Sequence, residues 1–120
     1  MYGEEEKQEL FTVVEEEAVS DIVDAAVAQY PWADEVFQAA VWLIAKDRES
    51  GEPIPGTTPL RRLMYLRPNR LAKSPGVLVR YWVEDVTAGA AEDRIVVDWV
   101  KFYDYDDDDA VTPAAYIHKP

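Results

Sequence analysis

The sequence predicts an α+β domain in which helices pack on one face of a single sheet. Apolar residues recur at helical spacing between residues 20 and 47, and the segments on either side are rich in β-branched and aromatic residues. The expected order is an N-terminal strand, two antiparallel helices or one kinked helix, and then a three-stranded antiparallel meander. Strands and helices grouped in this way are typical of an α+β layer.

The N-terminal strand is expected at residues 9–15, and the helical region follows it. Ser20 is a suitable N-cap, because its side-chain oxygen can accept a hydrogen bond from the first helical turn. Pro31 should interrupt or restart the helix, since proline is favoured at a first helical position. We therefore predict helices at about 20–30 and 31–47, with one kinked helix as the alternative.

Three further strands are expected after the helices, at residues 60–67, 76–84 and 94–103. Prolines, glycine and threonines mark residues 53–59 as a loop, and residues 67–75 read as a turn-rich connection. A hairpin loop is expected at 87–92. The last strand is apolar on both faces, so it should be paired on both sides.

Alternation divides each of the last two strands between two faces. In the first of them, one face carries Val77, Val79, Tyr81 and Val83, and the other carries Leu78, Arg80 and Trp82. In the second, one face should carry Ile95, Val97, Trp99 and Lys101, and the other Val96, Asp98, Val100 and Phe102.

Composition predicts one domain over residues 1–120, with flexible polar or acidic tails at 1–8 and about 106–120. The chain has no cysteine, so disulfides, thiol nucleophiles and thiolate metal sites are excluded. The first residues lack the basic and apolar regions of a signal peptide, and no apolar run approaches the roughly 20 residues that span a bilayer. These features favour a cytoplasmic protein without a membrane partner.

The basic residues are concentrated in residues 53–83, a segment without Asp or Glu in a chain of net charge −12. The members of this group are Arg61, Arg62, Arg67, Arg70, Lys73 and Arg80. They are candidate residues for binding an anion or an acidic partner, and nucleic acid could meet the protein only there. Alternatively, they neutralise the chain's own carboxylates, and Asp98 is expected to pair with Arg80 across the hairpin.

No cofactor or metal site is predicted. Asp104, Asp106 and Asp108 have the spacing of an EF-hand loop, but Asp109 and Ala115 replace the glycine and the glutamate that the loop requires. His118, the only histidine, lies near the terminus and is not expected to act as a base. The four tryptophans could stack on bases, but core packing is the favoured interpretation.

The chain resembles the RelE/ParE toxin superfamily over about residues 10–105. The resemblance is carried by an early strand, a helical pair that ends in WLIAKDRESGEPIPG, and the segments LRRLMYLRPNR, VLVRYWVED and RIVVDWVKFYDY. It implies a component of a toxin–antitoxin module that is bound by an extended antitoxin segment. RelE-like members are ribosome-dependent endoribonucleases, whereas ParE-like members inhibit DNA gyrase.

The chain departs from the ribonuclease pattern at two places. Leu78 stands where the mid-strand arginine is expected, with Arg80 two residues further on the same face. After the last strand come Asp104, Tyr105 and four more aspartates in place of basic residues. Carboxylates there would repel the phosphate whose charge must be stabilised.

The leading interpretation is therefore a toxin-module protein that acts by binding an antitoxin-like peptide or a protein target, not by catalysis. The alternative is an mRNA endoribonuclease. Its phosphate ligands would be Arg61, Arg62, Arg67 and Arg80, and Tyr103 or Tyr105 would act as acid, base or stacking group. A third interpretation is an acidic inhibitor, of the kind that phages encode, which mimics nucleic acid. A homodimer is compatible with each.

Overall fold

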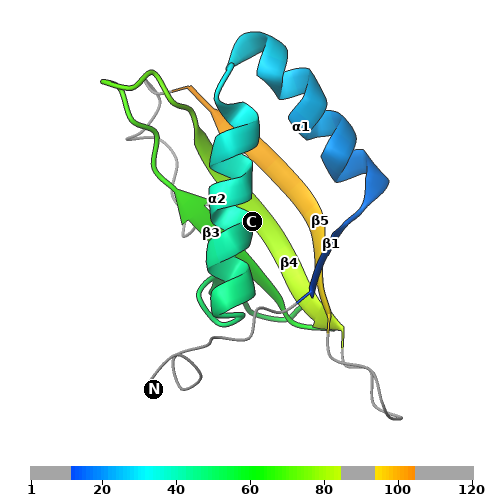
Figure 1. Ribbon diagram of the computed structural model, residues 1–120. Coiled ribbons are helices and arrows are strands. Elements are labelled where there is room, and N and C mark those ends of the chain that lie inside the picture. The colour runs from blue at the N-terminus through cyan, green and yellow to red at the C-terminus, as the bar shows by residue number, and fades with distance from the viewer. Residues whose placement is uncertain (1–11, 85–93, 105–120) are drawn as a thin grey trace, which may run out of the picture.

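The computed structural model describes residues 12–84 and 94–104, which form a sheet with two helices on one of its faces (Figure 1). The elements in chain order are β1 (Thr12–Glu15), α1 (Glu17–Gln29), α2 (Ala33–Lys46), β2 (Glu52–Ile54), β3 (Arg61–Leu66), β4 (Gly76–Glu84) and β5 (Arg94–Tyr103). The strands lie in the order β1-β5-β4-β3-β2. The predicted α+β class, with two helices on one sheet, is confirmed.

The sheet is larger than the predicted three-stranded meander, and it is mixed. β3, β4 and β5 are antiparallel neighbours as expected, but β2 adds an edge strand and β1 pairs with β5 in parallel. β2 overlaps the start of the stretch predicted as a loop, residues 53–59. Pro53 is tolerated in β2 because an edge strand needs hydrogen bonds on one side only.

The helical region is two helices, so the kinked-helix alternative is wrong. The first helix ends at Gln29 and the second begins at Ala33, and α2 runs back across the sheet beside α1 (Figure 1). The predicted N-cap at Ser20 is also wrong, because α1 begins one turn earlier, at Glu17. The hydroxyl of Ser20 donates instead to the carboxylate of Glu15 at 3.0 Å, and the carbonyl of Glu16 accepts the first helical hydrogen bonds.

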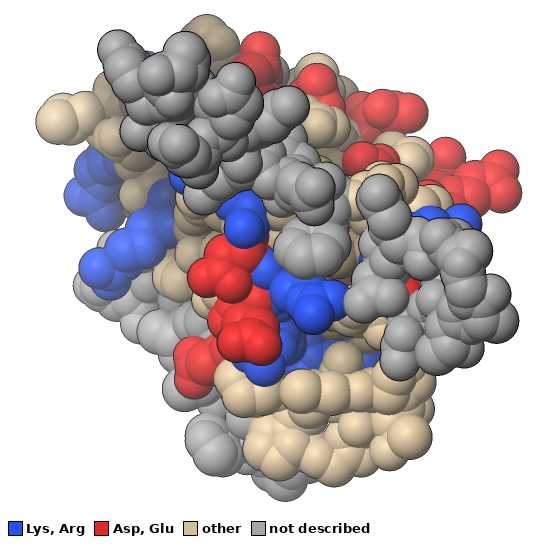
Figure 2. Space-filling view, turned by 60° about the horizontal axis from the view of Figure 1, so that its bottom comes forward, with Lys and Arg blue, Asp and Glu red and all other residues tan. Residues whose placement is uncertain are grey.

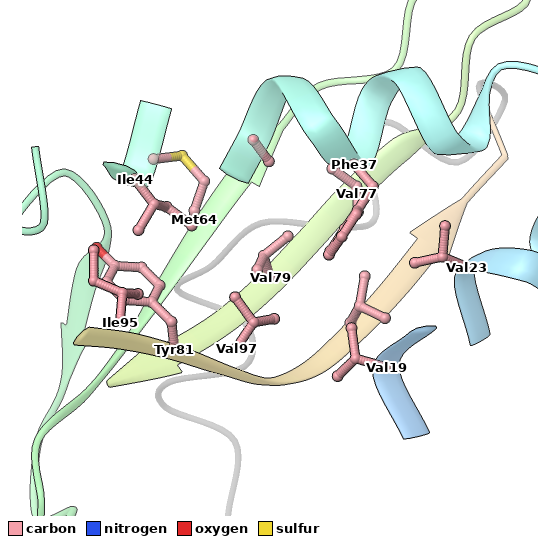
Figure 3. Packing of buried hydrophobic residues seen from close by; sticks show 12 residues of the cluster. Val19, Val23, Phe37, Ile44, Met64, Val77, Val79, Tyr81, Ile95 and Val97 are labelled. Carbon is pink, nitrogen blue, oxygen red and sulfur yellow. The ribbon is translucent and has the colours of Figure 1, made fainter. Parts of the chain in front are cut away.

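The main core lies between the helices and the sheet (Figure 3). α1 contributes Val19 and Val23, and α2 contributes Phe37, Ala40 and Ile44. The sheet meets them with side chains from its three inner strands, namely Met64, Val77, Val79, Tyr81, Ile95, Val97 and Val100. The prediction that Val77, Val79, Tyr81 and Val83 share one face of β4 is therefore confirmed, because the first three are in this core and Val83 packs against it.

Tyr81 joins this core to the chain that follows α2. Its buried hydroxyl accepts a hydrogen bond from the amide of Gly51 and donates one to the carbonyl of Arg48, each at 2.9 Å. A Cβ on residue 51 would lie 2.9 Å from the Tyr81 ring and from the carbonyl oxygen of Leu63. Glycine is thus required by close approach.

Several predictions fall outside the described residues: the tails at 1–8 and 106–120, and the hairpin loop at 87–92. Within the described ranges, no helix is long and apolar enough to cross a membrane.

Candidate functional site

The face of the sheet opposite the helices carries the chain's most distinctive polar cluster. Its side chains come from β2 to β5, and we call this surface the open face. Its members are Ile54, Arg61, Leu63, Tyr65, Leu78, Arg80, Trp82, Asp98, Trp99, Lys101 and Tyr103.

A β-bulge in β5 determines which side chains reach the open face. Arg80 pairs with Trp99, but the next residue, Tyr81, pairs with Val97, so Asp98 is the additional residue. The bulge places Asp98 and Trp99 on the same face, whereas a regular strand would send them to opposite faces. The face assignment predicted for β5 is therefore wrong beyond Asp98, because alternation assumes an unbroken ladder.

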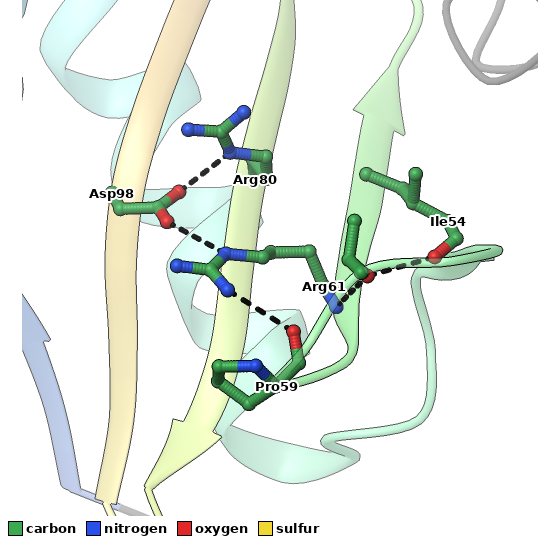
Figure 4. A network of polar contacts seen from close by, with 6 residues as sticks. Ile54, Pro59, Arg61, Arg80 and Asp98 are labelled. Atoms are coloured by element: carbon green, nitrogen blue, oxygen red, sulfur yellow. Dashed lines mark hydrogen bonds and ion pairs between the residues drawn. The ribbon is translucent and has the colours of Figure 1, made fainter.

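Asp98 lies between two arginines and accepts from both (Figure 4). Nε of Arg80 donates to Oδ1 at 2.8 Å, and Nε of Arg61 donates to Oδ2 at 3.2 Å. The carboxylate side chain is only 6% exposed, whereas those of Arg61 and Arg80 are 26% and 39% exposed. The predicted ion pair between Arg80 and Asp98 is confirmed, and Arg61 joins it.

The two guanidinium groups are held further by neighbours on the face. Arg61 lies 5.5 Å from the centre of the Trp82 ring, and its Nη1 donates to the carbonyl of Pro59 at 3.1 Å. The Cζ atom of Arg80 lies 6.0 Å from the centre of the Trp99 ring. The terminal nitrogens of both arginines point away from the space between them, which the Asp98 carboxylate occupies (Figure 4). An added anion could bridge Arg61 and Arg80 only by displacing the Asp98 carboxylate, whose negative charge would repel it.

An apolar cluster lies beside these charges. Leu63, Leu78 and Tyr103 are buried, and Ile54, Tyr65 and Trp99 pack against them. A surface cavity of about 180 Å³ opens between Ile54, Leu63, Arg80 and Trp99. Small-molecule and cofactor sites usually measure about 300–1,000 Å³, so this cavity suits a single side chain of a partner better.

The other predicted basic residues lie elsewhere. Arg62 extends from the helix side of β3, where its Nη1 donates to the carbonyls of Gly51 at 2.8 Å and Glu49 at 3.3 Å. Arg67, Arg70 and Lys73 lie in the connection between β3 and β4. The basic residues are therefore divided among the open face, the helix side of β3, and the connection between β3 and β4. Arg61 and Arg62 are separated because alternate residues of a strand face opposite sides of the sheet.

A larger cleft, of about 340 Å³, lies at the end of the molecule near the C-terminal end of α2. Arg48, Glu49, Leu60, Arg62 and the Tyr81–Val83 segment line it. Seen from this end, acidic and basic side chains lie next to one another at the centre of the view (Figure 2). Burial raises the pKa of Tyr81, so its hydroxyl stays protonated at neutral pH and cannot act as a base.

Of the two tyrosines proposed for catalysis, the structure describes only Tyr103. Tyr103 is buried in the apolar cluster of the open face, with Lys101 lying 5.2 Å from its ring centre. Tyr105 lies outside the described residues, as do the aspartate run from Asp106 and His118. In the part of the chain that the structure describes, no group of three or more acidic or histidine side chains could hold a metal ion.

Comparisons with known proteins give no assignment. No protein-family model, curated protein or solved structure matches this chain.

Sequence reasoning missed two features of the site. The first is the ion pair between Arg61 and Asp98, because nothing in the sequence of β3 distinguishes Arg61 from its neighbour Arg62. The second is the bulge at Asp98. An acidic residue within an apolar strand, opposite an arginine-bearing strand, is the one signal that could have indicated it.

Proposed function

We propose that the protein is a RelE/ParE-like binding protein that acts by contacting another protein through its open face, without cleaving RNA. Tryptophan, tyrosine and arginine are the residue types that dominate protein–protein binding energies, and the open face gathers all three. Asp98 holds Arg61 and Arg80 in place before any partner arrives. Binding then costs less side-chain entropy than it would with mobile arginines.

The position of Asp98 is the observation that carries the proposal. Cleavage of RNA needs positive charge focused on the scissile phosphate. Here a nearly buried carboxylate fills the space between the two arginines of the sheet face, so the pair and its counter-ion together carry only one net positive charge. One net positive charge matches a single carboxylate of a protein partner, whereas cleavage of RNA passes through a transition state in which the phosphate carries about two negative charges.

The RelE/ParE-like architecture is supported by the order of elements, in which a strand and a helical pair precede the longer antiparallel strands. That likeness favours an extended segment, as in an antitoxin or a protein target, lying across the open face. One apolar side chain of the segment would enter the cavity lined by Ile54, Leu63 and Trp99.

Site-specific photo-crosslinking in cells of the source organism tests the proposal. A photoreactive phenylalanine analogue replaces Trp82 on the open face, and in a matched control it replaces Trp42, which is exposed on α2. We expect one discrete protein adduct from position 82 and none from position 42. Absence of an adduct at position 82, or equal adducts at both positions, would overturn the proposal.

The endoribonuclease alternative is tested in parallel on translating ribosomes. We expect no site-specific mRNA cleavage from the unaltered protein. Cleavage that is lost in Arg80→Ala, while the variant keeps its folded circular-dichroism spectrum, would establish the enzyme and refute a purely binding role.

A further inference from the structure

The connection between β3 and β4, residues 67–75, exposes the apolar side chain of Leu71 to solvent. Asn69 and Ser74 exchange two backbone hydrogen bonds at 3.0 Å, and the side chain of Asn69 accepts from the amide of Ala72 at 3.1 Å. Lys73 completes the turn with a φ of 56°. Leu71, between these fixed points, is 97% exposed. A fully exposed leucine on an ordered turn gains by burial in a partner, with little ordering cost.

The apolar surface continues from this turn onto the start of α2. A groove of about 350 Å³ is lined by Trp32, Val36, Ala39 and Ala72, together with Glu35 and Ser74. Trp32 itself is 52% exposed. We call Trp32, Ala39, Leu71 and Ala72, with the flanking Arg70 and Lys73, the tip surface.

The charge of the turn restricts what can cover the tip surface. Residues 67–75 contain Arg67, Arg70 and Lys73 and no acidic residue. Glu35 is the acidic residue in the lining of the groove, so the occupant should offer apolar side chains to the groove and carboxylates to the basic turn.

The same chain carries a surface of that chemistry on α1. Glu17, Asp21 and Asp24 are exposed there, and the helix has no Lys or Arg. Ile22 and Val27 are exposed large apolar residues on the same helix. In the upper half of Figure 1, α1 and the β3–β4 connection lie on opposite sides of the start of α2.

We propose that a second copy of this chain covers the tip surface, with Leu71 of each copy packing against α1 of the other near Ile22. A two-fold pair makes this contact twice, because each copy presents both surfaces. Lys73 and Arg70 would then face the carboxylates of the partner copy. The contact leaves the open face of the sheet available and does not depend on the function proposed above.

Sedimentation equilibrium of the full chain tests this contact, at protein concentrations from about 1 µM to about 1 mM in about 0.15 M salt. We expect a monomer–dimer equilibrium that Leu71→Asp and Ile22→Lys each weaken by about tenfold or more. Trp42→Asp changes an apolar position that is 52% exposed and lies outside both surfaces, and it should leave the equilibrium unchanged. All three positions are on the surface, and thermal unfolding verifies that each variant is folded.

A charge exchange makes the test specific to the proposed pairing. Lys73→Glu and Asp21→Lys should each weaken self-association, but an equimolar mixture of the two variants should form a heterodimer as tightly as the unaltered chain. A chain that is monomeric throughout the concentration range would overturn the proposal. So would a dimer that is insensitive to Leu71→Asp and Ile22→Lys, or a mixture that shows no recovery.

Discussion

The two faces of the sheet bury their side chains in different ways. The covered face meets two helices and is almost wholly apolar, with the hydroxyl of Tyr81 as its main polar anchor. The open face has a smaller apolar cluster, next to which two arginines share one nearly buried carboxylate. The first arrangement stabilises the fold through area removed from water. The second fixes charged and aromatic groups at a surface, which is what a binding site requires.

The largest expected effect contrasts a core residue with one on the open face. Phe37→Ala should lower the free energy of unfolding by about 3–5 kcal/mol, because it leaves a cavity between α2 and the sheet. Trp82→Ala should cost no more than about half of that, since its ring is only partly buried. Urea unfolding of both variants measures the difference, and equal losses would mean that the open face is also a core.

The polar anchor of the covered face gives the next effect. Tyr81→Phe removes the partner of the Gly51 amide and the Arg48 carbonyl, and we expect a loss of about 1–3 kcal/mol. Hydrogen exchange of the Gly51 amide should accelerate in this variant. An unchanged exchange rate would show that the hydroxyl does not hold the chain after α2.

The charged cluster of the open face should contribute less than the anchor. Asp98→Asn leaves two partly exposed guanidinium groups without their counter-ion, for an expected loss of about 1–2 kcal/mol. A double-mutant cycle with Arg80→Ala isolates the pair. Additive losses would mean that the contact contributes no interaction free energy.

The smallest effect is a pH dependence confined to alkaline solution. Burial raises the pKa of the Tyr81 hydroxyl above its ordinary value of 10.0. The folded protein therefore keeps this proton at pH values where the unfolded chain has lost it. Its contribution to stability is complete below about pH 10 and is lost as the pH rises through the folded-state pKa. Urea unfolding should show a shallower alkaline loss for Tyr81→Phe, and parallel curves would exclude Tyr81 as the source.

The fold class could be predicted because periodicity in α2 and alternation in β4 report burial directly. The edge strand β2 could not, since its pairing depends on β3 and its three residues include a proline. The predicted start of α1 is wrong because Ser20 is a residue type that often caps helices. In the structure its hydroxyl donates a hydrogen bond to the carboxylate of Glu15.

Of the candidate site, only the ion pair between Arg80 and Asp98 could be predicted from the sequence. The Arg80–Asp98 contact follows from two adjacent antiparallel strands, whereas the sequence could not indicate which of the basic residues bind an anion or a partner and which neutralise the chain's own carboxylates. Strand geometry separates Arg61 from Arg62, and the connection between β3 and β4 carries Arg67, Arg70 and Lys73 away from both. Charge along a sequence does not report which side of a sheet each residue occupies.

The central claim is that the chain's own carboxylate occupies the anion position between Arg61 and Arg80. Titration with inorganic phosphate, followed through the Nε–H resonances of the two arginines by NMR, measures this directly. The unaltered protein should show no saturable shift up to about 10 mM phosphate, whereas Asp98→Asn should bind phosphate within that range. Saturable binding by the unaltered protein that equals or exceeds that of Asp98→Asn would contradict the account.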